Sequence, residues 1–324
     1  MADIAVMSLS GIYDRENFYH RYLEDNIAVF HDLTGVSGAN GYCSEDSETR
    51  FQELMEGNLS SRIHFIDNGN YHYMSLLWME AVMEKGMDYA LIYFDNHSDR
   101  QDAAFGGLLS CGSWVKEAED RLSGLHKTIW VNSDEVVISG EVESNDLHNA
   151  FSHSVNETGD EMGHGLHNPS IARGCRLEGT AGTGLHNSQI NLSNKCGDTN
   201  DYSLHNLAKS QANKSEDAAA YDLHNSFRLP INEFEAAVEN SLHNTPVYIS
   251  VDKDVLSEDE VRTNWDQGHM SLDEFLLHLS ILLDKCEVRG IDICGGPDRY
   301  ADDSDVKKDD EVNGRILRFL SDHY

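Results

Sequence analysis

The chain has 324 residues, of which 40% are hydrophobic, so it is long enough to bury a substantial core. It carries 57 acidic against 24 basic residues, a formal net charge of −33, which would repel a nucleic-acid backbone or an anionic membrane. Neither is expected as a partner. The same surplus suits a well-solubilised protein and would favour cationic ligands.

The cysteines and the apolar runs indicate the compartment. Six cysteines are scattered without a CxxC pair, so disulfides and zinc knuckles are not expected. The N-terminus lacks a basic start followed by a long apolar core, and no apolar run approaches the roughly 18 residues that a membrane span needs. A cytoplasmic location is therefore expected.

Short apolar runs alternate with helical patterns along the chain. Three runs predict buried strands, at 63–66 (IHFI), 89–94 (YALIYF) and 247–251 (VYISV). Apolar spacing of three and four predicts helices at 74–83 and at 272–283, the second capped by Ser271. This alternation predicts a three-layer α/β/α fold with a mainly parallel sheet, in which functional residues collect at the carboxyl ends of the strands.

A tandem repeat interrupts this pattern. The triplet Leu-His-Asn recurs every 19 residues, with its leucine at 147, 166, 185, 204, 223 and 242. Only the last unit predicts a regular helix, because Phe234, Ala237 and Val238 have helical spacing. The earlier units are rich in Gly, Ser, Asn and Asp, which predicts a disordered or partly helical surface insertion at about 141–222 without a catalytic role. A short solenoid is the alternative. We therefore expect a single domain over 1–324, interrupted by this insertion.

The strongest chemical signal lies just after the three predicted strands. DNHSD follows YALIYF, DKD follows VYISV, and a histidine follows IHFI in GNYHY. Because alternate side chains of an extended segment point to one side, these motifs can aim four carboxylates and two imidazoles at one place. Such a set can hold two divalent cations. The candidate metal ligands are His72, Asp95, His97, Asp99, Asp252 and Asp254.

These motifs resemble those of the arginase and agmatinase superfamily, the ureohydrolases. GNYHY, DNHSD and SVDKD match that family's GGDHS-like turn, DAHxD and SxDxD motifs. The resemblance covers roughly 60–140 and 228–296, and it is closer to a branch of arginase-like proteins that carry FGGLLSCG and TNWDQG. It implies the same three-layer fold and two manganese ions about a bridging hydroxide, although other divalent metals could serve. Asp95 and Asp252 would be shared between the two ions, with His72 and Asp99 on one and His97 and Asp254 on the other.

The resemblance implies a manganese-dependent hydrolase of C–N bonds acting on a small guanidino, amidine or amide compound. Asp99 would also steer the hydroxide through a hydrogen bond. Where the family has a proton-shuttling histidine, this chain has Cys111, which is therefore a candidate for proton transfer or for nucleophilic attack, with an inert buried thiol as the alternative. A homo-oligomer is compatible with the sequence.

Substrate recognition departs from the family. Glycine stands near the end of DICG, where the guanidinium-pairing carboxylate of an arginase would fall, and a different loop follows SVDKD. In that loop, Trp265, Asp266 and Gln267 are candidate substrate contacts, because an aromatic face, a carboxylate and an amide suit a cationic or amide ligand. Packing and turn formation are the alternative roles of these three residues.

Two other functions remain open. A deacetylase-like amidohydrolase shares this fold and part of the metal set but uses one zinc ion and fewer aspartates. A non-catalytic metal-binding regulatory protein would explain a cysteine in place of the proton-shuttling histidine.

Overall fold

The computed structural model describes residues 3–134, 136–140, 231–242 and 245–324, and all of them belong to one compact unit. The predicted repeat insertion at 141–222 lies outside these described residues. None of the described helices is long and apolar enough to cross a membrane.

Within the described part of the chain, an eight-stranded sheet forms the centre, in the order β2-β1-β4-β10-β9-β5-β7-β8. Every neighbouring pair is parallel except β7 and β8, which run antiparallel. The strands are β1 (Ile4–Ser8), β2 (Ala28–Asp32), β4 (Ile63–Phe65), β5 (Tyr89–Phe94), β7 (Leu125–Val131), β8 (Val136–Gly140), β9 (Val247–Asp252) and β10 (Val288–Cys294). A two-stranded antiparallel sheet pairs β3 (Tyr42–Cys43) with β6 (Leu109–Ser110).

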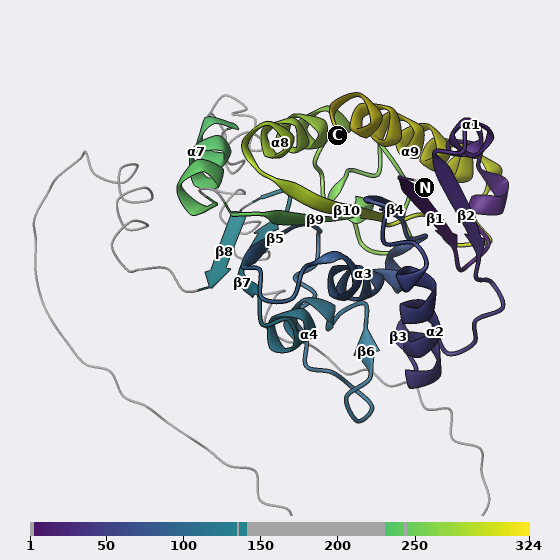
Figure 1. The fold of residues 1–324 in the computed structure, drawn as a ribbon. Coiled ribbons are helices and arrows are strands. Elements are labelled where there is room, and N and C mark those ends of the chain that lie inside the picture. The colour runs from purple at the N-terminus through teal and green to yellow at the C-terminus, as the bar shows by residue number, and fades with distance from the viewer. Residues whose placement is uncertain (1–2, 135, 141–230, 243–244) are drawn as a thin grey trace, which may run out of the picture. The chain divides into compact units, whose positions relative to one another are not determined.

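Helices cover both faces of the sheet. In Figure 1, α2, α3 and α4 lie on one side of the sheet, and α7, α8 and α9 lie on the other. The described helices are α1 (His20–Glu24), α2 (Glu45–Glu56), α3 (Met74–Val82), α4 (Trp114–Arg121), α7 (Ile231–Ser241), α8 (Leu272–Lys285) and α9 (Asp303–His323). Short 3₁₀ turns are η1 (Tyr13–Arg15), η2 (Gly69–Tyr71) and η4 (Lys253–Val255). The predicted three-layer α/β/α fold with a mainly parallel sheet is confirmed.

The strand β5 shows why a continuous apolar run forms a central strand. All six of its residues are buried, and they alternate between two hydrophobic clusters. Ile92 and Phe94 belong to the cluster that includes α8 and α9, whereas Leu91 and Tyr93 belong to the cluster that includes α2 and α3. A strand with period-two side chains and helices on both faces needs apolar residues at every position.

The predicted helices also form. The α3 helix begins at Met74, and the α8 helix begins at Leu272 after Ser271, whose hydroxyl accepts a hydrogen bond from the Glu274 amide at 3.2 Å. The α7 helix buries Phe234 and Val238, two residues whose spacing predicted it.

Candidate metal centre and active site

The candidate site lies at the carboxyl edge of the middle of the sheet. The strands β4, β10, β9 and β5 are consecutive neighbours and parallel, so their carboxyl ends meet at one edge. His72 follows β4 after the η2 turn, Asp95 follows β5, and Asp252 ends β9. The topology therefore brings the three predicted motifs together.

His72 lies at the centre of the first group of donors. Its Nδ1 is 3.1 Å from Asp95 Oδ2 and 3.1 Å from Asp99 Oδ2, and 3.6 Å from Asp252 Oδ2. The side chains of His72 and Asp95 are each 1% exposed. These donors could hold a divalent cation.

His97 lies at the centre of the second group. Its Nδ1 is 2.7 Å from Asp254 Oδ2 and 3.6 Å from Asp95 Oδ1. Asp95 thus presents one oxygen to each group, as the resemblance implied for a shared ligand. The structure brings all six predicted metal ligands into two adjoining groups.

Two buried atoms of the site lack hydrogen-bond partners, namely His72 Nδ1 and Asp95 Oδ2. They lie 3.1 Å apart without the geometry of a hydrogen bond. A buried contact without hydrogen-bond geometry offsets less of the desolvation cost of the two groups than a hydrogen bond would. A divalent cation between them would satisfy both, so the residues present fit a metal.

The raised pKa values of the clustered side chains also fit bound cations. Burial, together with the neighbouring Asp254 carboxylate, raises the pKa of Asp252 to about 7. Burial and the Asp95 carboxylate likewise raise the pKa of Asp254 to about 7, whereas hydrogen bonds to Asp254 and Asp95 raise the pKa of His97 to about 11. The cluster therefore concentrates negative charge that bound cations would compensate.

Two candidate ligands form hydrogen bonds with neighbouring side chains that fix their orientation. Ser250 Oγ lies 2.9 Å from His72 Nε2, which leaves Nδ1 facing the carboxylates. The buried Trp114 donates from Nε1 to Asp99 Oδ2 at 2.7 Å. Such partners set the tautomer and direction of metal ligands. Neither Ser250 nor Trp114 was singled out from the sequence, although Ser250 lies within the SVDKD motif.

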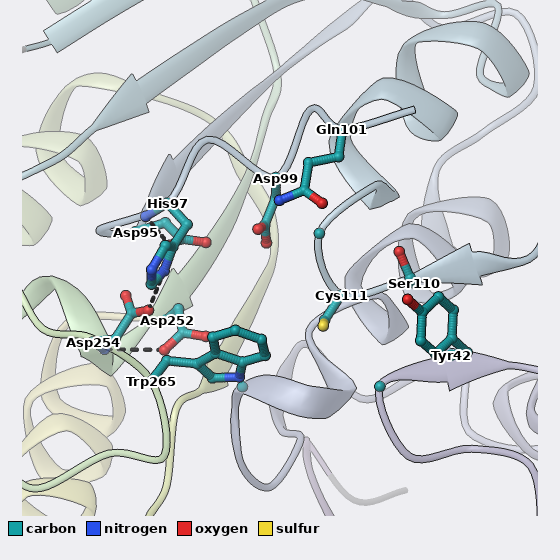
Figure 2. A pocket seen from close by; sticks show the side chains of 13 residues that line it. Tyr42, Asp95, His97, Asp99, Gln101, Ser110, Cys111, Asp252, Asp254 and Trp265 are labelled. Carbon is teal, nitrogen blue, oxygen red and sulfur yellow. Dashed lines mark hydrogen bonds and ion pairs between the residues drawn. The ribbon is translucent and has the colours of Figure 1, made fainter. Parts of the chain in front are cut away.

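A cavity of about 190 Å³ opens onto the six-ligand cluster. Figure 2 shows Asp95, His97, Asp99, Asp252 and Asp254 on one side of it and Tyr42, Ser110 and Cys111 on the other. Among the described residues, the charged groups that line this cavity are candidate ligands, and the remaining lining residues are uncharged: Gly41, Tyr42, Gly69, Gln101, Ser110, Cys111, Gly112 and Trp265.

Cys111 lines this cavity. In the resemblance to ureohydrolases, it stands where that family has a proton-shuttling histidine. Burial, reinforced by the carboxylates of Asp99 and Asp252, raises the pKa of its thiol to about 12. Without a bound cation, a thiol in these surroundings is protonated at neutral pH.

The three candidate substrate contacts are placed differently. Trp265 lines the cavity with its ring centroid 5.8 Å from that of His97. Gln267 donates to the Leu256 and Val261 carbonyls and so braces its own loop, and the exposed Asp266 accepts a hydrogen bond through its carbonyl from Asn96. Neither Asp266 nor Gln267 is among the residues that line the cavity.

At residue 295, near which the arginase-type carboxylate would fall, the backbone lies very close to Asp252. Gly295 has φ +86°, and a Cβ there would lie 2.2 Å from Asp252 Oδ1. Asp292, three residues earlier, is buried and pairs instead with His64 at 2.6 Å. No side chain at residue 295 could reach the cavity without displacing a candidate ligand.

Solved structures share this architecture. The proclavaminate amidino hydrolase from Streptomyces clavuligerus aligns with a TM-score of 0.53 and 13% identity over 99% of this chain and 90% of that chain. An arginase from Bacillus caldovelox gives 0.51 and 10% over 99% and 98%, and a hypothetical agmatinase from Burkholderia thailandensis gives 0.51 and 12% over 98% and 86%.

The chain has the arginase and agmatinase fold. The resemblance inferred from the three motifs is confirmed at the level of the fold. No family model matches this arginase-like sequence, and no curated protein matches it. Because the identities to the solved structures are 10–13%, the arginase-like fold is what they establish.

Proposed function

We propose that this chain is a binuclear metal-dependent hydrolase that cleaves C–N bonds in small guanidino, amidine or amide compounds. The observation that carries the proposal is the convergence of His72, Asp95 and Asp252 from three strand ends, with unpartnered buried atoms on His72 and Asp95. The shared fold supports the reaction class, because the solved neighbours include an amidino hydrolase and an arginase.

The six ligands would hold two divalent cations, with Asp95 between the two groups and manganese as the expected metal. When bound, two such cations lower the pKa of a water molecule and neutralise the negative charge that develops when it attacks a planar carbon. Asp99 would orient that water through a hydrogen bond, and its carboxylate is held by contacts of Trp114 and His72 with Oδ2.

Cys111 would supply the proton for the leaving nitrogen. Its thiol lines the cavity, and bound cations would lower its pKa toward the range in which a general acid works, so it could donate to a developing amine and regain a proton from water. This assignment treats Cys111 as an acid, with nucleophilic attack as the alternative.

The uncharged lining favours a substrate whose non-reacting part is uncharged. Tyr42 and Trp265 offer aromatic surfaces, and Gln101 offers an amide at the same cavity. Among the described residues, no lysine or arginine lines the cavity to pair with a substrate carboxylate. Asp266 and Gln267 stay predicted contacts that would need the loop of Trp265 to rearrange.

The competing functions differ in metal count. Four aspartates in the two groups favour two ions over the single zinc of a deacetylase-like enzyme. A regulatory metal-binding protein would hold metal without turnover.

The test loads purified protein with manganese, cobalt or zinc and screens guanidino, amidine and acyl-amide compounds for release of urea or ammonia. We expect turnover by the metal-loaded protein and none by Asp252→Ala. Asp259→Ala is the matched control, because Asp259 is exposed in the segment that follows the same strand. Full metal loading without turnover of any compound class would favour the regulatory function.

A further inference from the structure

A third potential donor group adjoins the site and includes a residue outside the six predicted ligands. Cys294 ends β10, and the parallel register pairs it with Asp252 at the end of β9. Its Sγ lies 3.6 Å from Asp252 Oδ2, the same oxygen that lies 3.6 Å from His72 Nδ1. The donor atoms of His72, Asp252 and Cys294 all lie within 4.8 Å of one another, and all three residues are buried.

The spacing of these atoms suits one metal ion. Two donors on a tetrahedral ion with bonds of about 2.0–2.3 Å lie about 3.3–3.8 Å apart. Both distances to Asp252 Oδ2, 3.6 Å from the sulfur and 3.6 Å from the imidazole nitrogen, fall in that range.

Two further contacts suit a cation in this group. The His72 side chain is 1% exposed, and its Nδ1 faces carboxylate oxygens of Asp95 and Asp99 at 3.1 Å without hydrogen-bond geometry, while Nε2 contacts Ser250. Cys294 Sγ faces two acceptors, the Asn68 carbonyl at 3.4 Å and Asp252 Oδ2 at 3.6 Å, but a thiol has one proton. The single thiol proton can therefore satisfy only one of these two oxygens fully.

We propose that Cys294 is a metal ligand, and that it holds one of the two ions together with His72 and Asp252. This inference rests on the proposed binuclear site. On binding, the thiol proton leaves to solvent and the sulfur coordinates as thiolate. Thiolate is a soft donor, so this position favours Zn²⁺ or Co²⁺ over Mn²⁺, whereas the position beside His97 and Asp254 keeps nitrogen and oxygen donors.

The other described cysteines provide controls. Cys111 lines the cavity but belongs to no donor group among the described residues. Cys43 lies in β3, and Cys286 follows the last residue of α8.

The test uses full-length protein loaded with Co²⁺ and measures the near-ultraviolet sulfur-to-cobalt charge-transfer band. We expect the band in the unsubstituted protein and in Cys111→Ser, and its loss in Cys294→Ser. Cobalt affinity should fall at least about tenfold in Cys294→Ser, and the preference for zinc over manganese should fall with it.

X-ray absorption of the zinc-loaded unsubstituted protein gives a second measurement that needs no variant. One sulfur scatterer at about 2.3 Å per two zinc ions is expected. Two ions per chain with nitrogen and oxygen scatterers alone, or a band lost in Cys111→Ser and kept in Cys294→Ser, would overturn the assignment of Cys294 and leave the proposed hydrolase standing. A protein that binds none of these metals would remove the proposed function itself.

Discussion

Gly295 shows how a single residue shapes this site. A Cβ at residue 295 would lie 2.2 Å from Asp252 Oδ1 and 2.5 Å from the Lys253 amide nitrogen, so only glycine lets the two strand ends approach. We expect Gly295→Ala to push Asp252 out of position and to weaken metal binding at least about tenfold, as loss of a ligand's support does. Calorimetric titration with Mn²⁺ and Zn²⁺ measures this.

The control for Gly295→Ala is Gly86→Ala. Gly86 has φ +83°, close to that of Gly295, but a Cβ there meets nothing within 4 Å. The control carries the same backbone strain without the contact, so its metal affinity should be unchanged. Equal losses in both variants would mean that strain, and not contact with Asp252, sets the effect.

The six candidate ligands could be brought together from the sequence because each lies next to a recognisable strand end, within three short motifs. The residues that contact these candidate ligands could not be predicted in the same way. Ser250 meets His72 across 178 residues, and Cys294 meets Asp252 across 42. Such pairs depend on the strand order, which local patterns do not contain.

Lys253 links the turn between two candidate ligands to the last helix. Its ammonium is fully buried, forms an ion pair with Asp309 of α9 and donates to Asn313 Oδ1 at 2.7 Å. The side chains of Lys253 and Asp309 are both 0% exposed. The α9 helix thereby contacts the backbone that carries Asp252 and Asp254.

We expect Lys253→Met to destabilise the fold by about 3–5 kcal/mol, because the buried Asp309 carboxylate then loses its ion-pair partner. Adding Asp309→Leu should recover part of that loss, since one of the two buried carboxyl groups beside Lys253, those of Asp309 and Glu16, is then gone. Lys116→Met is the surface control, with an expected change of about 0–1 kcal/mol, because its partner Asp102 is 89% exposed at the side chain. Denaturant unfolding measures all three. No recovery in the double variant would contradict this account of the pair.

His278 on α8 should make folding sensitive to acid. It packs against Phe234 of α7 with ring centroids 4.4 Å apart, and burial lowers its pKa to about 4. The unfolded chain binds a proton near the ordinary histidine pKa, about 6.5, whereas the folded chain does not. The stability from neutral His278 is therefore present above pH 6.5 or so and is lost as the pH falls toward about 4, by about 3 kcal/mol in total.

We expect His278→Leu to remove this component, so that its unfolding free energy falls less than that of the unsubstituted protein between pH 7 and pH 4.5 or so. The exposed His126, changed to leucine, is the control and should leave the pH profile unchanged. Parallel profiles for all three proteins would show that His278 is not neutral in the fold.

The strands predicted at 63–66, 89–94 and 247–251 are present within a residue of their expected bounds, since uninterrupted apolar runs mark a sheet covered on both faces. The strand β10 was missed. Its sequence VRGIDIC contains Arg289, Gly290 and Asp292, and the apolar pattern is broken because Asp292 is buried through its pairing with His64 and Tyr248. A buried polar pair of this kind is visible only once the partners are known.

At the scale of the whole molecule, the six candidate ligands and the described residues that line the cavity lie outside 141–230. Removing the repeat insertion therefore retains all six candidate ligands. We expect a chain lacking residues 150–221 to bind the same number of metal ions as the full chain, as elemental analysis would show. Loss of metal in that variant would mean that the repeats contribute to the site or its folding.

The measurement that tests the central claim most directly is the metal stoichiometry of the purified full-length protein after reconstitution with manganese, cobalt or zinc. Two ions per chain are predicted, with neither retained by Asp252→Ala and both retained by Asp259→Ala. A chain that binds one ion or none under the same conditions would contradict the binuclear site.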